Sequence, residues 1–279
     1  MEVLMLNSFD DVAGADRAAR RLQQGLRRAG VDARLLVQFR YGQALGRDFT
    51  VADLARDHEA VFLAPGLWSG RRLDLEGGQA VRAVDALGFL CAFRERGKAE
   101  VGAEVLVVGG GSVAMDAALA ARGSGAGKVT LVCLEKEVEM PALAGEVAEL
   151  RRQGVEILNG WGPRAFVSAN RVSLVGCDSV FDAQGRFSPC YDESRTMELG
   201  FDQLIWAVGQ SAEPFLAGYL HREFGFNGRL EVDPETLQVA GREAVFAGGD
   251  IVRGAGTVVE AVADGRRAAK GIHALLGRV

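Results

Sequence analysis

The sequence predicts an α/β fold in which one unit of alternating strands and helices is inserted into another. Short apolar runs alternate with segments of helical period, glycine-containing turns follow several runs, and the order of strand, glycine turn and helix recurs near the C-terminus. The chain has 279 residues, of which 48% are hydrophobic and 37 are glycine. That length and apolar content suffice for one large domain or two smaller ones, each with its own core.

The hydrophobic period places the individual elements. Apolar runs predict strands at residues 3–6, 33–37, 60–64, 104–108, 129–133, 204–208 and 244–247. Helical spacing predicts helices at residues 17–28, from a glycine-rich turn to about 122, at 145–153, at 258–276, and around a stripe of Val84, Leu87 and Cys91. Residues 172–197 alternate and turn like an antiparallel excursion. We expect an outer domain of residues 1–98 and 212–279 around an inserted domain of residues 99–211.

Charge and scattered reactive residues argue against several classes of function. The net charge is −5, and no run of lysine or arginine marks a surface for nucleic acid or an anionic membrane. The N-terminus does not read as a signal peptide and no apolar stretch approaches the roughly 18 to 20 residues of a membrane span, so we expect a cytoplasmic protein. The three histidines are isolated and the cysteines form no Cys-x-x-Cys pair, so we expect neither a metal site nor a redox-active dithiol. We expect the cysteines to be small buried side chains: Cys91, Cys133, Cys177 and Cys190.

The most informative segment is VLVVGGGSVA, where an apolar strand runs into a G-x-G-x-x-A turn and then a helix. In such a turn Gly109 permits the tight bend, Gly111 lets a pyrophosphate approach the backbone, and Ala114 keeps the helix close to the strand. The helix start at Ser112 and Val113 offers free N–H groups to the phosphates. The segment predicts a dinucleotide-cofactor site, with an ordinary glycine-rich turn as the alternative.

Glu135 ends the next predicted strand, 24 residues after Gly111. An acid about 20 residues after the glycine turn accepts hydrogen bonds from the ribose hydroxyls of the cofactor. A carboxylate there repels a 2′-phosphate, so Glu135 predicts NAD(H) in preference to NADP(H). The alternative is that Glu135 is a solvated member of the acidic run with Glu137 and Glu139, beside Lys136.

Four segments give the chain a resemblance to a known family. They are VLVVGGGSVAMD (105–116), EMPA (139–142), IWAVGQ (205–210), and VFAGGD (245–250) followed by GTVVEAVADGRRAA (256–269). From about Leu26 onward the sequence resembles the flavin-containing small subunit of glutamate synthase and its relatives. The resemblance implies two Rossmann-like dinucleotide-binding domains, the NAD(P)-binding one inserted into the flavin-type one. It also implies hydride transfer from NAD(P)H to FAD, and electron transfer onward to a protein acceptor or a larger oxidoreductase subunit.

The resemblance further implies cofactor-binding residues in the C-terminal half: Gly209, Gly249, Asp250, Gly256, Thr257 and Val258. Asp250 would hydrogen-bond the flavin ribityl chain, and the backbone of residues 256–258 would present a helix N-terminus to the pyrimidine edge of the ring. By itself, Gly-Gly-Asp after a strand is equally typical of a turn. NADPH-using members of the family carry two arginines where this chain has Leu134 and Glu135, which also favours NADH.

The N-terminus departs from the family pattern, which begins with an iron–sulfur segment and a G-x-G-x-x-G loop for the adenosine half of FAD. The first loop here, residues 7–16, has one glycine and three carboxylates, and the second predicted strand is followed by Gln38 instead of an acid. Such a loop repels pyrophosphate, so the adenosine side of the FAD site is predicted to be incomplete. The first 38 residues instead resemble the start of a GT-B type glycosyltransferase, over too little chain to imply glycosyl transfer.

The sequence therefore predicts a pyridine-nucleotide-dependent flavin-type oxidoreductase or electron-transfer subunit. No catalytic side chain is predicted, because the cofactors carry hydride chemistry and the protein orients them. The alternative is a non-catalytic nucleotide-binding module or a remnant without functional FAD. The acidic first loop at residues 7–16 favours this alternative. The sequence does not predict an oligomeric state.

Overall fold

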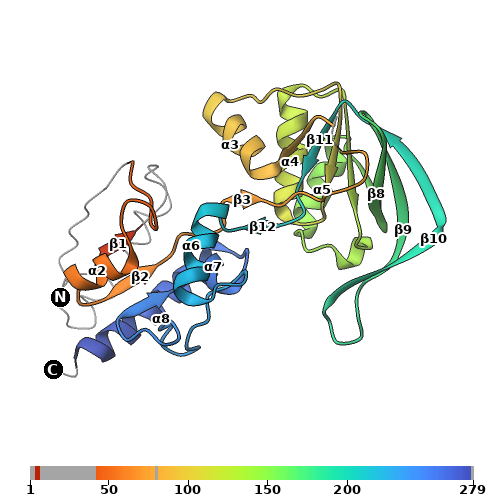
Figure 1. Cartoon of the computed structure of the whole chain (residues 1–279). Coiled ribbons are helices and arrows are strands. Elements are labelled where there is room, and N and C mark those ends of the chain that lie inside the picture. The colour runs from red at the N-terminus through yellow and green to blue at the C-terminus, as the bar shows by residue number, and fades with distance from the viewer. Residues whose placement is uncertain (1–3, 7–41, 79–80, 278–279) are drawn as a thin grey trace. The chain divides into compact units, whose positions relative to one another are not determined.

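The computed structural model describes residues 4–6, 42–78 and 81–277, and Figure 1 shows their elements in chain order. The chain divides into two compact units. The outer unit comprises Met1–Ser69 and Gln210–Val279, and the inserted unit comprises Gly70–Gly209. Each unit has its own parallel sheet and its own buried apolar side chains.

Among the described residues, the sheet of the outer unit has three parallel strands. They are β1 (Leu4–Leu6), β2 (Val61–Leu63) and β13 (Val245–Ala247), with β2 in the middle. Every residue of β2 and β13 is buried, as is typical of strands in a parallel sheet. The described helices of this unit are α2 (Val51–Asp57), α6 (Pro214–Phe224), α7 (Asp250–Arg253) and α8 (Val258–Leu276).

Two of these helices, α2 and α6, were not predicted. Thr50 caps α2, since its side chain accepts a hydrogen bond from the backbone N–H of Asp53 (3.1 Å), and α6 begins at Pro214. The buried N–H of Val51 donates to the hydroxyl of Tyr219 (2.8 Å), which joins α2 to α6. Both helices are short, and their buried side chains pack into the apolar core of the outer unit.

The inserted unit is built on a five-stranded parallel sheet in the order β4-β11-β5-β6-β7. Its strands are β4 (Ala83–Asp85), β5 (Glu104–Val108), β6 (Lys128–Cys133), β7 (Glu156–Asn159) and β11 (Gln203–Trp206). Its helices are α3 (Ala86–Arg96), α4 (Ser112–Ser124), α5 (Ala144–Arg152) and the 3₁₀ turn η2 (Glu137–Glu139). An antiparallel sheet of β8 (Trp161–Ser168), β9 (Arg171–Phe181) and β10 (Phe187–Gly200) is inserted before β11.

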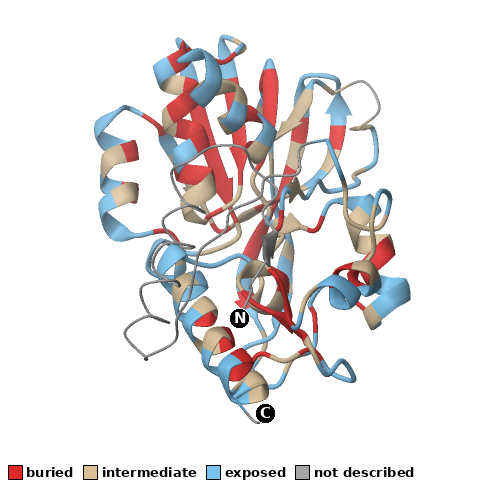
Figure 2. Cartoon of the chain, turned by 90° about the vertical axis from the view of Figure 1, so that its left-hand side faces the viewer, coloured by how far each residue is buried: buried red, intermediate tan, exposed pale blue. Residues whose placement is uncertain are grey.

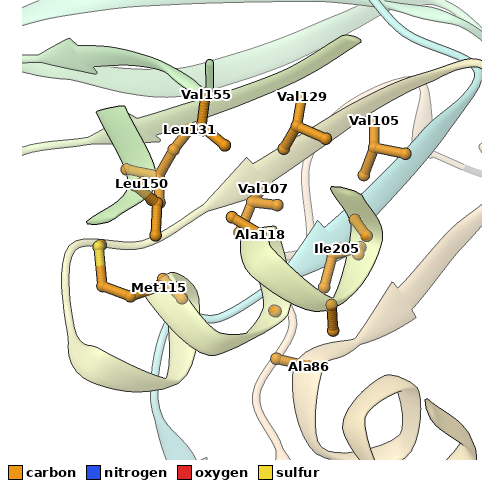
Figure 3. Packing of buried hydrophobic residues seen from close by; sticks show 14 of the residues in the cluster. Ala86, Val105, Val107, Met115, Ala118, Val129, Leu131, Leu150, Val155 and Ile205 are labelled. Atoms are coloured by element: carbon orange, nitrogen blue, oxygen red, sulfur yellow. The ribbon is translucent and has the colours of Figure 1, made fainter. Parts of the chain in front are cut away.

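Small side chains let α4 pack closely on the parallel sheet. The buried residues of α4 are mostly alanines, which leave room for the valines and leucines of β5 and β6. Figure 3 shows Ala118 of α4 next to Val107 of β5, with Met115 and Leu150 completing the cluster. In Figure 2 the inner strands of the two parallel sheets are mostly buried, whereas the helices around them expose one side. This packing fixes the start of α4 beside the end of β5.

The chain passes between the units at two points. Strands β3 (Ser69–Gly70) and β12 (Gln210–Ser211) lie at these points and pair with each other as a two-stranded sheet. Within the inserted unit, the N–H of Arg71 donates to the carbonyl of Gly209 (3.0 Å), so the two ends of this unit lie side by side. Strand β13 lies in the sheet of β1 and β2 whereas β5 lies in the five-stranded sheet, as an insertion requires.

The boundary between the units differs from the expected one. Residues 70–98 were predicted in the outer domain, yet β4 pairs with β11 and α3 packs against α4, so they belong to the inserted unit. The predicted stripe of Val84, Leu87 and Cys91 is also wrong, because Val84 is in β4 and Cys91 is exposed. The side chain of Asp85 accepts a hydrogen bond from the N–H of Gly88 (2.9 Å) and starts the helix after the strand.

The cysteines also differ from expectation. Cys133 and Cys177 are buried as predicted, but Cys91 and Cys190 are exposed. Cys91 lies on the solvent side of α3, whose buried residues are Ala86 and Phe89. Cys190 lies on β10, whose residues are mostly exposed because it is the edge strand of the antiparallel sheet.

Candidate functional site

The glycine turn lies between β5 and α4, where the sequence places it. Gly109 has φ +141°, and a Cβ added there would lie 2.3 Å from the carbonyl oxygen of Ala207. Only glycine fits this close approach of two backbones. The N–H of Gly109 donates to the carbonyl of Val132 (2.9 Å), which ties the turn to β6.

Gly111 leaves open space at the start of α4. No atom lies within 4 Å of a Cβ added there, and its backbone is not left-handed. The N–H groups of Ser112 and Val113 come before the first intrahelical hydrogen bond, which Ala114 donates to the carbonyl of Gly111 (2.8 Å). Ala114 is fully buried, in line with its expected packing role. The geometry suits an anion held on the backbone in front of α4.

The carboxylate of Glu135 covers the middle glycine of the turn. A Cβ added to Gly110 would lie 2.5 Å from Glu135 Oε2, so the two are in close contact. The carbonyl of Glu135 accepts hydrogen bonds from Asn159 Nδ2 (3.1 Å) and from the N–H of Gly160 (3.2 Å). The end of β7 therefore holds the backbone of Glu135 in place. Glu135 is half-buried and lies against the glycine turn, whereas Glu137 and Glu139 are exposed.

Two further carboxylates near the turn were not singled out from the sequence. Ser112 Oγ donates to Glu146 Oε2 (2.7 Å), and the same oxygen accepts the N–H of Leu143 (3.0 Å). Burial and the neighbouring Glu146 raise the pKa of Asp116. The sequence contains a signal for Glu146 only. This residue lies three positions after Leu143, the cap residue of α5, and a glutamate at this spacing is common at helix starts.

The thiol nearest the turn is not reactive. Burial, and then the charge of Glu135, raise the pKa of Cys133 to about 12. The amide of Asn159 donates to its sulfur (3.3 Å). A thiol with such a pKa stays protonated near neutral pH and is a poor nucleophile.

In the outer unit, the Gly-Gly-Asp turn is fixed by a buried ion pair that the sequence did not reveal. Gly249 has φ +72°, and its N–H donates to the carboxylate of Asp264 (2.9 Å). Asp264 lies on α8 with no exposed surface and is paired with Arg253 of α7. Burial by itself would raise the pKa of Asp264, but the bonds from Arg253 and Gly249 outweigh it and hold this pKa below its usual range.

The predicted backbone donors at 256–258 are partly engaged within the unit. The N–H of Gly256 bonds to the carboxylate of Asp250, whose pKa is nevertheless raised, chiefly by burial. The N–H of Thr257 donates to Glu260 Oε2 (2.7 Å), and the hydroxyl of Thr257 caps α8. A ligand would have to replace these two bonds to use the donors. Val258 follows them with 77% of its surface exposed.

Gly209 lies at the end of the inserted unit and has φ +106°. Its carbonyl accepts the N–H of Arg71. Ala207, two residues earlier, is the residue that approaches Gly109. Gly209 therefore follows the segment that covers the glycine turn, and no described contact joins it to the turn directly.

Some expectations concern residues outside the described ranges. The first loop at residues 7–16, Gln38 and the helix at 17–28 all lie there. Among the described residues, no cluster of three histidine, cysteine or acidic side chains is arranged to hold a metal ion. The described helices include none long and apolar enough to span a membrane.

The chain is similar to known proteins over most of its length. Residues 37–265 match the family described as pyridine nucleotide-disulphide oxidoreductase. The chain is 39% identical over 244 residues to the NADP(+)-dependent formate dehydrogenase subunit beta of Moorella thermoacetica, covering 83% of this chain and 34% of that subunit. It is 34% identical to the glutamate synthase [NADPH] small chain of Azospirillum brasilense, covering 82% of this chain and 51% of the relative. The chain thus spans about a third to a half of these two relatives.

The fold is also that of solved structures. FprA from Mycobacterium tuberculosis superposes with a TM-score of 0.70, covering 85% of this chain and 68% of that one. The sequence identity is 16%, so this similarity concerns the fold alone.

Proposed function

Because the chain belongs to the pyridine nucleotide-disulphide oxidoreductase family, we propose that its inserted unit binds NAD(P)H and its outer unit binds the flavin of FAD. The observation that carries this proposal is the glycine turn. Gly109 closes the backbone on Ala207, Gly111 leaves the helix start open, and Glu135 lies over the residue between them. The phosphates would thus lie at the helix start after Gly111, and the ribose would lie next to them at Glu135, both at the carboxyl end of the sheet.

The residues of the inserted unit fit a dinucleotide. The pyrophosphate would lie against Gly111 and accept hydrogen bonds from the amides of Ser112 and Val113. The carboxylate of Glu135 would accept hydrogen bonds from the adenosine ribose. Glu146 keeps the hydroxyl of Ser112 turned toward α5, so the backbone amide and not the hydroxyl of this serine is the donor.

The outer unit offers a site for the ring end of a flavin. Asp250 is half-buried, and the neighbouring Val258 and Val259 have 77% and 78% of their surfaces exposed. Exposed valines at a helix start suit contact with a flat aromatic ring. The ion pair of Asp264 with Arg253 would keep the Gly249 turn in position for the ribityl chain.

The chemistry belongs to the cofactors. When bound, NAD(P)H supplies a hydride, which FAD accepts together with a proton from water. The role of this chain is to hold the nucleotide by residues 109–114 and Glu135, and the flavin by residues 249–258. The relatives are named as subunits or chains of larger enzymes, and we propose that the electrons pass from the flavin to a partner protein.

We further propose that NADH is preferred over NADPH. Glu135 stands against the turn where a 2′-phosphate would bring further negative charge, and Leu134 supplies no cation. The two relatives are named for NADP(+) and NADPH, so this chain would differ from them in the nucleotide it selects.

A second candidate function rests on the first loop of the sequence. Its three carboxylates oppose a pyrophosphate, so a nucleotide-binding module without FAD is the alternative. The visible spectrum of the purified chain separates the two. An absorption band near 450 nm that is bleached by NADH without oxygen supports the oxidoreductase; nucleotide binding without this band, even after FAD is added, supports the module.

A further inference from the structure

We propose that Tyr191, together with Leu134, forms the surface on which the adenine base of the dinucleotide stacks. This inference rests on the proposed NAD(P)H site and adds to it a residue from the antiparallel sheet. Tyr191 lies on β10, far along the sequence from the glycine turn. Nothing in the segment around it marks it as a cofactor residue.

The contacts at Gly162 place Tyr191 beside Leu134. A Cβ added to Gly162 would lie 2.7 Å from Leu134 Cδ2 and 3.1 Å from Tyr191 Cε1. Both side chains therefore cover the same bare glycine. The register agrees, since Tyr191 pairs with Cys177 and Gly162 pairs with Val175, two residues away on the same strand. Alternate residues of a strand share a face.

This pair continues the order of the proposed site. Leu134 and Glu135 follow the end of β6, and Gly162 lies just beyond the end of β7. Parallel sheets bind ligands at the carboxyl ends of their strands. Moving outward from Gly111, the site offers an open helix start for phosphate, Glu135 for ribose, and then Leu134 with Tyr191. An adenosine group presents phosphate, ribose and base in the same order.

The chemistry of the pair suits a purine. Tyr191 has 41% of its surface exposed, and Leu134 is half-buried beside it. An aromatic ring and an aliphatic side chain match the apolar faces of a base, which stacks on tyrosine irrespective of its polar edge. The nearby Trp161 is less suitable, because the guanidinium of Arg195 lies over its ring at 5.2 Å.

The experiment is a titration of the purified full chain with NADH and with ADP-ribose, which contains adenosine and pyrophosphate but no nicotinamide. The variants are Tyr191→Ala and Tyr191→Phe, with Phe187→Ala as a control because Phe187 is an exposed aromatic residue on the same strand. We expect Tyr191→Ala to weaken both ligands by the same factor, about 5- to 30-fold. Tyr191→Phe keeps the ring and should bind within about twofold of wild type, as should Phe187→Ala.

Each outcome bears on the proposal. Unchanged binding by Tyr191→Ala would overturn the adenine contact while leaving the nucleotide site intact. A loss for NADH without a loss for ADP-ribose would assign Tyr191 to the nicotinamide half and would also overturn it. If wild type bound neither ligand, the proposed function itself would fail, and the adenine contact with it. Unfolding midpoints of the variants within a degree or so of wild type establish that a loss of affinity is not a loss of fold.

Discussion

The carboxylate of Asp264 is paired with the guanidinium of Arg253 at a place where Asp264 has no exposed surface. Arg253 keeps 32% of its side chain exposed, so the two partners are not equivalent. A buried charge without a partner is costly, whereas a partly exposed one can be hydrated. The pair holds α7, α8 and the N–H of Gly249 together.

Removing Arg253 should therefore destabilise the outer unit more than removing the charge of Asp264. We expect Arg253→Met to lower the free energy of unfolding by about 3 to 5 kcal/mol and Asp264→Asn by less. Denaturant unfolding measures both. Arg56→Met is the control, because the ion pair of Arg56 with Asp53 is largely exposed and should contribute no more than about 1 kcal/mol. Equal losses in the two test variants would contradict this asymmetry.

The same pair predicts a dependence on pH. The pKa of Asp264 is lower in the folded protein than in the unfolded chain, so the unfolded state binds a proton more readily. The stability from this group is present above the unfolded pKa and is lost as the pH falls through the folded pKa. The difference in unfolding free energy between wild type and Asp264→Asn should therefore shrink as the pH is lowered below about 4. A constant difference down to pH 2 would refute this.

A side chain added at each of two glycines of the turn should have a different effect: loss of nucleotide binding at Gly111 and loss of stability at Gly109. Gly111→Val places its side chain in open space, so the fold should survive while the proposed position of the pyrophosphate is blocked. Gly109→Ala forces a Cβ onto the carbonyl of Ala207 at a positive φ, and should cost at least about 1 to 3 kcal/mol of stability. Thermal unfolding and NADH calorimetry separate the two effects. If the folded Gly111→Val variant bound NADH as wild type does, the assignment of the glycine turn to the nucleotide site would be wrong.

Glu135→Arg should reverse the choice of nucleotide. In the proposed site the wild-type carboxylate would accept hydrogen bonds from the ribose and repel a 2′-phosphate, so we expect NADH to be favoured by about 2 to 4 kcal/mol, or roughly 30- to 1000-fold. Paired titrations with NADH and NADPH measure the ratio. Glu100→Arg makes the same charge change at a side chain that is 90% exposed and should leave the ratio unchanged. Tighter binding of NADPH by wild type would refute the role of Glu135.

The hydrogen bond between α2 and α6 can be tested by removing one oxygen. Tyr219→Phe leaves the buried N–H of Val51 without the hydroxyl it donates to, and should cost about 1 to 3 kcal/mol. Tyr191→Phe makes the same change at a half-exposed tyrosine and should cost less than about 0.5 kcal/mol. Denaturant midpoints compare the two, and an equal effect would mean that the bond adds nothing.

Local patterns predicted the parts of the fold whose causes are local. The glycine turn follows β5 as expected, because glycine spacing and an apolar strand leave few other conformations. Helix α8 spans the predicted residues 258–276, since Thr257 and Glu260 form its capping box. The contact of Glu135 with the turn also follows from its place at the end of a strand next to β5.

Contacts between distant residues were not predictable in this way. From the sequence alone, Asp264 would be assigned to the exposed side of a helix. In the structure, the turn at residues 254–257 places its partner Arg253 against it. The position of Tyr191 depends on the register of β10, which contains bulges that no alternation pattern reveals. The boundary at 98 was misplaced because β4 is short and its pairing with β11 joins parts of the chain more than a hundred residues apart.

The adjacent ends of the inserted unit have a consequence for how such a chain can change. Because the N–H of Arg71 bonds to the carbonyl of Gly209, residues 70–209 enter and leave at neighbouring points. A segment with adjoining ends can be removed, or exchanged for another of similar end spacing, while the host sheet of β1, β2 and β13 keeps its hydrogen bonds. The inserted unit, which we propose to bind the nucleotide, and the host sheet can therefore diversify separately, because the two chain crossings lie next to each other in space.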